Sequence, residues 1–110
     1  MKTPHLEKRE HPRFEIEVPV TLRTQGKLIP AATLDLSAGG ICVLADFNEE
    51  IPEGAVEVVM DLSRELKDVS LRGHILRMQR GIGQKVAIQF VPLDSKGYRD
   101  LEKFLRNRLH

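Results

Sequence analysis

The sequence has a single cysteine, Cys42, in 110 residues, which excludes an internal disulfide bond. Cys42 lies in an apolar run, where a small buried thiol is the ordinary interpretation. No neighbouring histidine or aspartate in the sequence suggests an activated nucleophile. The length suits one domain with its own core, and the cysteine usage favours a reducing, cytoplasmic setting.

The sequence also has no excess of charge of one sign. Its 17 Lys and Arg residues nearly balance 16 Asp and Glu residues, for a formal net charge of +1. A nucleic acid polymer is bound largely by neutralising many phosphates, which needs a basic surface. The composition therefore disfavours nucleic acid polymers as partners.

Long hydrophobic runs are missing too. No window approaches the ~18 apolar residues of a membrane span, and the first ten residues have no apolar core of a signal peptide. We expect a soluble protein without membrane insertion.

Patterns of catalytic or metal-binding residues are likewise scarce. The histidines, with Asp, Glu and Cys, form no recognised metal spacing, and Ser37 is not in a Gly-x-Ser-x-Gly elbow. No acid–base pair can be picked out among the carboxylates. The sequence predicts neither an enzyme nor a cofactor.

What the sequence does contain is alternation of apolar and polar residues. Phe14 to Leu22 alternates with the period of a strand that has one wet face, and Pro19 should lie at an edge or a bulge because it cannot donate to a ladder. Turn signals separate further strands and a loop at 47–55. The predicted strands that follow are 28–36, 41–45, 56–60 and a hairpin of 69–78 with 86–91 around the turn at 81–83.

The C-terminal segment changes to a helical period. Tyr98, Leu101, Leu105 and Leu109 recur at three and four residues and predict a helix over 95–108, with Asp94 or Ser95 as its cap. Six short strands followed by one helix are typical of a mostly β protein. They predict a small antiparallel barrel or sandwich, which the helix packs against or plugs.

The first candidate functional motif is Arg9-Glu10-His11-Pro12-Arg13. Pro12 keeps the segment from being helical, so a loop presents the two arginines. Each guanidinium offers a planar fork of donors that matches phosphate oxygens or the O6 and N7 acceptors of guanine. Taken alone, the pair also fits ordinary solvated arginines.

The second candidate motif is Asp35-Leu36-Ser37-Ala38-Gly39-Gly40. In an extended segment Asp35 and Ser37 leave the same face, and a carboxylate can accept from the N1 and N2 hydrogens of guanine. Gly39 and Gly40 permit positive φ and leave room for a ligand against the backbone. The alternative is a plain turn in which the polar side chains cap local amides.

Together the two motifs resemble the signature of the PilZ domain, a bacterial receptor for cyclic di-GMP (c-di-GMP). The resemblance extends to Gly83-Gln84-Lys85-Val86-Ala87-Ile88-Gln89-Phe90, similar to a late strand of the family, and covers about Lys8 to the C-terminus. It implies a six-stranded antiparallel β-barrel over 14–110 with a C-terminal helix, preceded by a flexible arm over 1–13.

The resemblance also implies roles for the motif residues. Arg9 and Arg13 would grip phosphates and guanines, Asp35 would read a guanine edge, and Ser37 would hydrogen-bond the ligand. Gly40, beside Gly39, would permit close approach. Lys8 stands where many members carry another arginine, and as an ammonium it pairs with phosphate but stacks less well. One ligand or an intercalated pair could bind.

The function that follows is a non-catalytic receptor for c-di-GMP that passes the signal to an unidentified downstream protein. Ligand binding would order the arm and so change the surface offered to that partner. Two alternatives remain: a barrel of the same fold that acts only as a protein-interaction adaptor, and a small enzyme acting on nucleotides.

Overall fold

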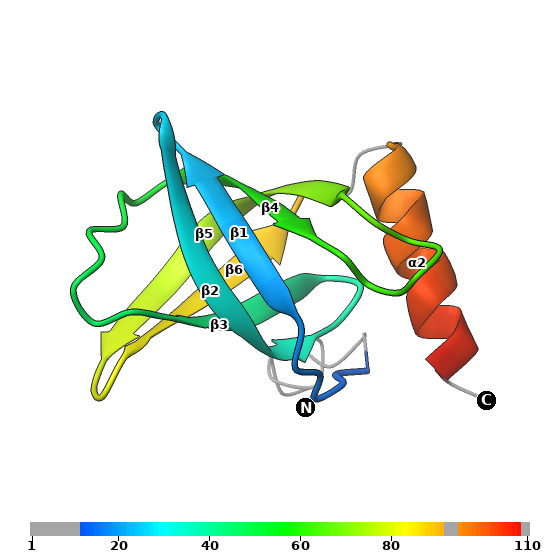
Figure 1. Ribbon diagram of the computed structural model, residues 1–110, viewed down its shortest axis with the longest axis horizontal. Helices are drawn as coiled ribbons and strands as arrows, with labels where there is room; N and C mark the ends of the chain where they lie inside the picture. Colours follow the sequence, from blue (N-terminus) through cyan, green and yellow to red (C-terminus); the bar gives the residue numbers. More distant parts are fainter. Residues whose placement is uncertain (1–11, 92–94, 109–110) are drawn as a thin grey trace, which may run out of the picture.

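The strands and the helix that the sequence predicts are all present in the computed structural model, which describes residues 12–91 and 95–108 (Figure 1). Their bounds lie within a few residues of the predicted ones, apart from the start of the first strand. The elements are β1 Pro19–Thr24, β2 Lys27–Leu36, β3 Gly40–Ala45, β4 Ala55–Met60, β5 Val69–Arg80, β6 Gln84–Phe90 and α2 Lys96–Arg108.

The strands close into a barrel in the order β1-β2-β3-β6-β5-β4. Every neighbouring pair is antiparallel. Two of the pairings, β1 with β4 and β3 with β6, join strands that are not consecutive and so close the ring. The predicted six-stranded antiparallel barrel is confirmed, and the sandwich alternative is excluded.

The core fills the barrel by alternation along the strands, which register shifts interrupt in β2 and β5. In β6, for example, Val86, Ile88 and Phe90 are buried while Lys85 and Gln89 face solvent. The same period of two places one face of every strand inside. The fully buried large side chains include Leu22, Ile29, Leu36, Val43, Val58, Val69 and Leu101.

The predicted start of the first strand at Phe14 is wrong, because regular pairing begins at Pro19. Between them the chain makes backbone hydrogen bonds to β2 at two places, a bridge between Phe14 and Leu36 and a bond from the Thr33 amide to the Val18 carbonyl. The ladder between β2 and β3 has a register shift between Thr33 and Asp35, so β2 is irregular where the stretch before β1 lies against it. Pro19 sits at the first position of its strand, where a missing donor is tolerated.

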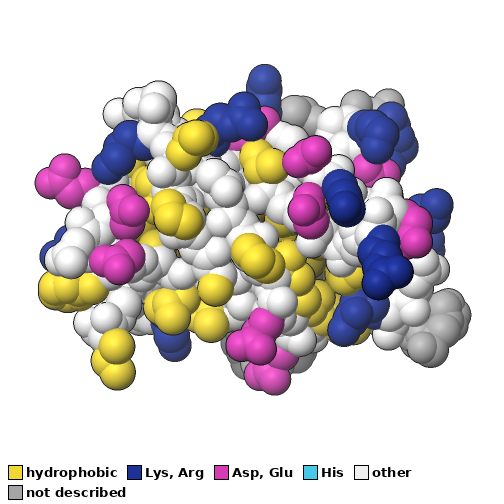
Figure 2. All heavy atoms as spheres, in the orientation of Figure 1, with side chains coloured by type: hydrophobic (Ala, Val, Ile, Leu, Met, Phe, Trp, Pro, Cys, Tyr) yellow, Lys and Arg dark blue, Asp and Glu magenta, His cyan; other side chains and the backbone are white. Residues whose placement is uncertain are grey.

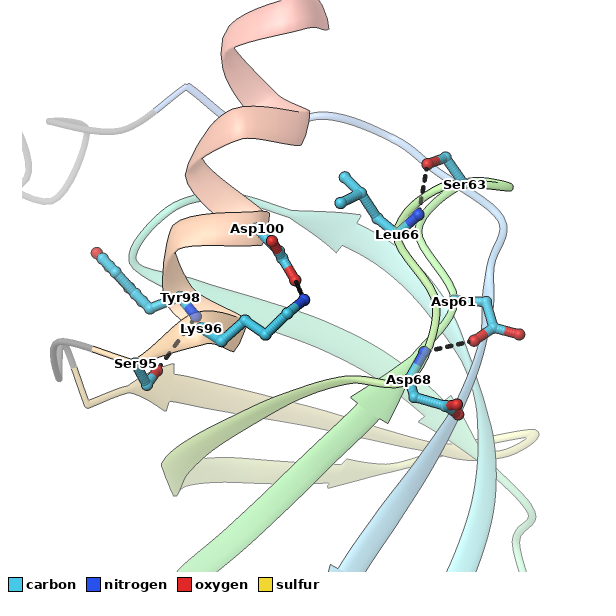
Figure 3. Close-up of polar contacts among 8 residues, drawn as sticks. All are labelled: Asp61, Ser63, Leu66, Asp68, Ser95, Lys96, Tyr98 and Asp100. Carbon is cyan, nitrogen blue, oxygen red and sulfur yellow. Dashed lines mark hydrogen bonds and ion pairs between the residues drawn. The ribbon is translucent and has the colours of Figure 1, made fainter.

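Helix α2 packs on one side of the barrel, near β5 (Figure 1). Ser95 caps it, as one of the two predicted candidates: its Oγ accepts a bond from the Tyr98 amide at 3.2 Å (Figure 3). Leu101, Phe104 and Leu105 are buried from the helix side. Asp94, the other predicted cap, and Leu109 lie outside the described residues.

The first turn of α2 approaches the barrel closely at Gly97. A Cβ atom at this position would clash with the carbonyl oxygen of Ser70 in β5. The side chains of Lys96 and Asp100 pair along the exposed side of the same turn, at 2.8 Å (Figure 3). The absent side chain at Gly97 therefore lets the start of the helix rest directly on a barrel strand.

The connection from β4 to β5 folds back on itself beside the helix. The Asp68 amide donates to Asp61 Oδ1 at 2.8 Å, and the Leu66 amide donates to Ser63 Oγ at 3.1 Å (Figure 3). These bonds replace ladder bonds where the chain leaves the sheet. The turn buries Leu62, which joins the core on the helix side.

Candidate functional site

A backbone bridge brings Arg13, the described end of the first sequence motif, beside the second motif. The Phe14 amide donates to the Leu36 carbonyl and the Leu36 amide donates to the Phe14 carbonyl, both at 2.9 Å. Arg13 directly precedes one member of this pair, and Asp35 and Ser37 flank the other. Segments more than twenty residues apart in sequence are thus pinned side by side, with Arg13 exposed to solvent.

Ser37 holds the shape of the bend Ser37–Gly40, which we call the motif bend. Its Oγ accepts from the amides of Gly39 and Gly40, each at 3.2 Å, and donates to the Gly40 carbonyl at 3.3 Å. The Ser37 amide donates to the same carbonyl at 2.9 Å. The hydroxyl and the backbone of one buried residue therefore fix the geometry of the whole bend.

Gly40 is required by packing rather than by positive φ. In the described chain, positive φ occurs at Gln25, Gly26, Gly54 and Asp68, and not in the motif bend. A Cβ atom on Gly40 would instead press on the carbonyl oxygen of Ile88 in β6. The conformational freedom that the sequence suggested for this glycine is not used, because the close neighbour is a strand.

Asp35 offers a carboxylate at the outer surface of the barrel. It is half-buried and stands in register with Cys42 of β3. Within residues 12–91 and 95–108 its side chain has no hydrogen bond or ion pair. Its carboxylate oxygens therefore accept no hydrogen bond from the described part of the fold.

The pKa of the Cys42 thiol is influenced by charged side chains from both sequence motifs and from β5 and β6. Burial raises its pKa above the ordinary value of 9.0, and the nearby Asp35 carboxylate raises it further. Lys85, Arg13 and Arg77 act in the opposite direction, since cations favour the thiolate. One outer patch of the barrel thus lies within electrostatic reach of both motifs.

Tyr98 is a residue of this region that sequence reasoning assigned only to a helix face. Its Oη donates to the carbonyl of Ala38, in the middle of the motif bend, at 3.1 Å. Burial, followed by the nearby Glu102, raises the pKa of this phenol. A contact between residues sixty positions apart leaves no trace in local periodicity, so the sequence had no signal for it.

A small hollow lies where the root of the arm, the motif bend and α2 come together. Its volume is about 170 Å³, and it opens to the surface. The residues that line it are Pro12, Phe14, Ala38, Glu102, Leu105 and Arg106. The helix therefore forms one wall of the hollow between the motif bend and the described end of the arm.

The structure describes most but not all of the predicted site residues. Arg13, Asp35, Ser37, Gly39 and Gly40 are brought together as set out above. Lys8 and Arg9 lie outside the described residues, so their contribution stays a prediction.

Two further properties concern the described ranges 12–91 and 95–108 alone. They contain no group of three or more His, Cys, Asp or Glu side chains placed to hold a metal ion. None of their helices has the length and apolar character needed to cross a membrane. In the face shown in Figure 2, acidic and basic side chains are interspersed rather than segregated, as the small net charge suggests.

These features define a class of protein: a closed antiparallel β-barrel flanked by a helix, with polar motifs gathered on loops and strand ends. A comparison with known families identifies the particular family, since residues 7–107 match the PilZ domain. The chain belongs to the PilZ domain family. Members of this family are receptor and adaptor domains.

Solved structures show the same fold at low sequence identity. The PilZ domain of YcgR from Escherichia coli, solved with c-di-GMP, has a TM-score of 0.74 at 12% identity, covering 91% of this chain and 90% of that one. The inhibitor of motility MotI/DgrA from Bacillus subtilis has a TM-score of 0.73 at 16% identity, over 93% of this chain. This chain spans about half of MotI, 51%.

A third structure is the PilZ domain of CeSA from a cellulose-synthesizing bacterium. Its TM-score is 0.67 at 19% identity, covering 90% of this chain and 99% of that one. No curated protein matches the chain.

Proposed function

We propose that this chain is a receptor for c-di-GMP. Its PilZ fold resembles the YcgR domain solved with that ligand. The observation that carries the proposal is the Phe14–Leu36 bridge, because Arg13 directly precedes Phe14 and Leu36 lies within the Asp-x-Ser-x-x-Gly motif. Arg13 supplies a planar fork for phosphate, and Asp35 has carboxylate oxygens to accept from a guanine edge.

The two motifs divide the work of recognition in this proposal. Arg9, Arg13 and Lys8 bind phosphates and guanine faces from the arm, residues 1–13. Ser37 and Gly40 keep the motif bend close to the barrel, and the hydroxyl can exchange a backbone partner for the ligand. Binding orders the arm against the barrel of residues 14–110, and that change is what a downstream protein recognises.

Calorimetric titration with c-di-GMP tests the proposal. Saturable binding is expected, and Arg13→Ala should weaken it by more than tenfold, since an unpaired phosphate contact costs about 1.5–3 kcal/mol. Arg23→Ala is the matched control, because Arg23 lies in β1 opposite the far end of β2 from the motif bend. Equal affinity of the Arg13 variant and the control would refute the clamp.

The titration also gives the ligand stoichiometry. One c-di-GMP per chain and an intercalated pair per chain differ twofold in the molar ratio at saturation. Cyclic di-AMP, which lacks the guanine edge, separates base reading from phosphate binding. Asp35→Ala should reduce the preference for c-di-GMP over cyclic di-AMP, and an unchanged preference would contradict the role of Asp35.

A second candidate function is a PilZ adaptor that does not bind the nucleotide. The observation that favours it is the Ser37 hydroxyl, whose bonds to Gly39 and Gly40 account for the serine and its neighbours by folding alone. In that case c-di-GMP gives no heat and no shift in melting temperature. The nucleotide is recovered unchanged after incubation in both cases, whereas an enzyme would consume it.

A further inference from the structure

One row of residues crosses four strands on the outside of the barrel, next to the motif bend. Asp35 of β2 is in register with Cys42 of β3, Cys42 with Ala87 of β6, and Ala87 with Arg77 of β5. Neighbouring strands lie about 4.8 Å apart, so the row spans roughly 14 Å from Asp35 to Arg77. We call these four residues the outer row.

The two middle residues of the outer row have small side chains, and its two end residues are charged. Cys42 and Ala87 are short and half-buried, while Arg77 is exposed. Lys85 is exposed on the same outer face of β6, two residues from Ala87. A floor of small side chains therefore has a carboxylate at one end, Arg77 at the other end, and Lys85 beside it on β6.

The charged side chains around the floor all influence the pKa of Cys42. Apart from burial, the groups that shift the pKa of Cys42 are Asp35, Lys85, Arg13 and Arg77. Arg13 belongs to the arginine motif, whereas Lys85 and Arg77 belong to neither motif. Arg13 from the arm and the two cations of β6 and β5 thus act on one patch.

Lys85 and Arg77 form no ion pair with an acidic side chain in the described chain. Residues 12–91 and 95–108 hold no ion pair of Lys85 or Arg77 with a carboxylate. Other surface cations do have partners, such as Arg23 with Glu57 at 3.2 Å. An anionic ligand on the floor would meet two available cations.

We propose that Lys85 and Arg77 form a second anion-binding subsite for the nucleotide, across the Cys42–Ala87 floor from Asp35. The subsite takes a phosphodiester of c-di-GMP while Asp35 faces a guanine. This inference rests on the proposed receptor function and extends the ligand surface from the two motifs onto β6 and β5. Arginine supplies a bidentate fork and lysine a point charge for the phosphate oxygens.

The first test is a double variant, Lys85→Met with Arg77→Met, titrated with c-di-GMP by calorimetry. Methionine keeps an unbranched apolar side chain, shorter than those of lysine and arginine, and removes the charge. The expected result is at least tenfold weaker binding than the unaltered protein, with a smaller dependence of affinity on salt concentration. Lys27→Met with Arg72→Met is the control, since it removes the same charge from exposed positions outside the outer row.

The second test uses Cys42 as a footprint, because it is the one thiol in the sequence. A ligand that lies on the floor covers this side chain. Alkylation of Cys42 by iodoacetamide should slow severalfold when c-di-GMP is saturating. Cyclic di-GMP at the same concentration should give less protection in the Lys85 and Arg77 double variant.

The outcomes separate this inference from the receptor proposal. If the unaltered protein binds no c-di-GMP, both proposals fall. If it binds, and Arg13→Ala weakens binding, the receptor stands. The subsite is then overturned if the Lys85 and Arg77 variant binds like its control and Cys42 reacts at the same rate with and without ligand. Circular dichroism melting of each variant verifies that it is folded.

Discussion

Gly40 is the residue at which packing and function are most easily confused. It belongs to the Asp-x-Ser-x-x-Gly motif, yet the structure gives a steric reason for a glycine here, since a Cβ atom would clash with the Ile88 carbonyl oxygen. The glycine is thus part of the seam between β3 and β6. A substitution at Gly40 should therefore change the stability of the barrel, whether or not a ligand is bound.

Gly40→Ala should lower the free energy of unfolding by about 1–3 kcal/mol, because the added methyl group must displace a backbone carbonyl. Gly81→Ala is the control: nothing lies within 4 Å of its added Cβ, and it should change stability by less than about 0.5 kcal/mol. Denaturant unfolding of both variants measures the difference. Equal stabilities would contradict the steric account.

The thiol of Cys42 provides a second prediction at this scale. Its alkylation rate should rise with pH to a midpoint above 9.0, since burial and Asp35 disfavour the thiolate. Asp35→Asn removes a negative charge and should lower the midpoint, while Arg77→Met removes a cation and should raise it. Shifts of the same sign in both variants would contradict this arrangement of charges.

At the scale of elements, the sequence predicted the strands and the helix well because their signals are local. The alternation in 69–78 and 86–91 and the helical spacing of Leu101 and Leu105 need only neighbouring residues. The start of β1 was missed for a nonlocal reason: the apolar alternation continues from Phe14, but the irregular stretch of β2 beside it does not pair evenly.

The residues of the candidate site also differ in whether the sequence alone could identify them. Arg13, Asp35 and Ser37 could be named from motif spacing and from the resemblance to a family. Lys85, Arg77 and Tyr98 could not, because their relation to the motifs depends on strand order and on the position of α2. Only the strand order of the closed barrel puts β6 next to β3 and β5 next to β6.

Tyr98→Phe tests the contact between α2 and the motif bend. Loss of the bond to the Ala38 carbonyl should cost about 0.5–1.5 kcal/mol of stability. Hydrogen exchange should quicken at the amides of Gly39 and Gly40 and stay unchanged in β1 and β4. Unchanged exchange in the bend would show that the tyrosine does not support it.

At the scale of the whole molecule, barrel and helix share one core. Leu101 is fully buried, and Phe104 and Leu105 are nearly so. Gly97 rests on β5, and Tyr98 is tied to the bend that leads into β3. Removing the helix would therefore expose apolar side chains of both parts, so we expect them to fold and unfold together.

This cooperativity can be measured without a label. The sequence has one tyrosine and no tryptophan, so tyrosine fluorescence reports Tyr98 in α2, whereas far-ultraviolet circular dichroism reports the entire fold. The two denaturant transitions should coincide. A fluorescence transition at lower denaturant than the circular dichroism transition would mean that the helix detaches first.

The bond between Tyr98 and Ala38 also bears on how fast the proposed receptor can respond. The motif bend and the helix are direct neighbours, so no rearrangement of separate domains has to intervene between them. Loop motions take about nanoseconds to microseconds, whereas collective domain motions take about microseconds to milliseconds. The surface of α2 would therefore follow the occupancy of the motif bend almost without delay, and the lifetime of the bound nucleotide would set the duration of the signal.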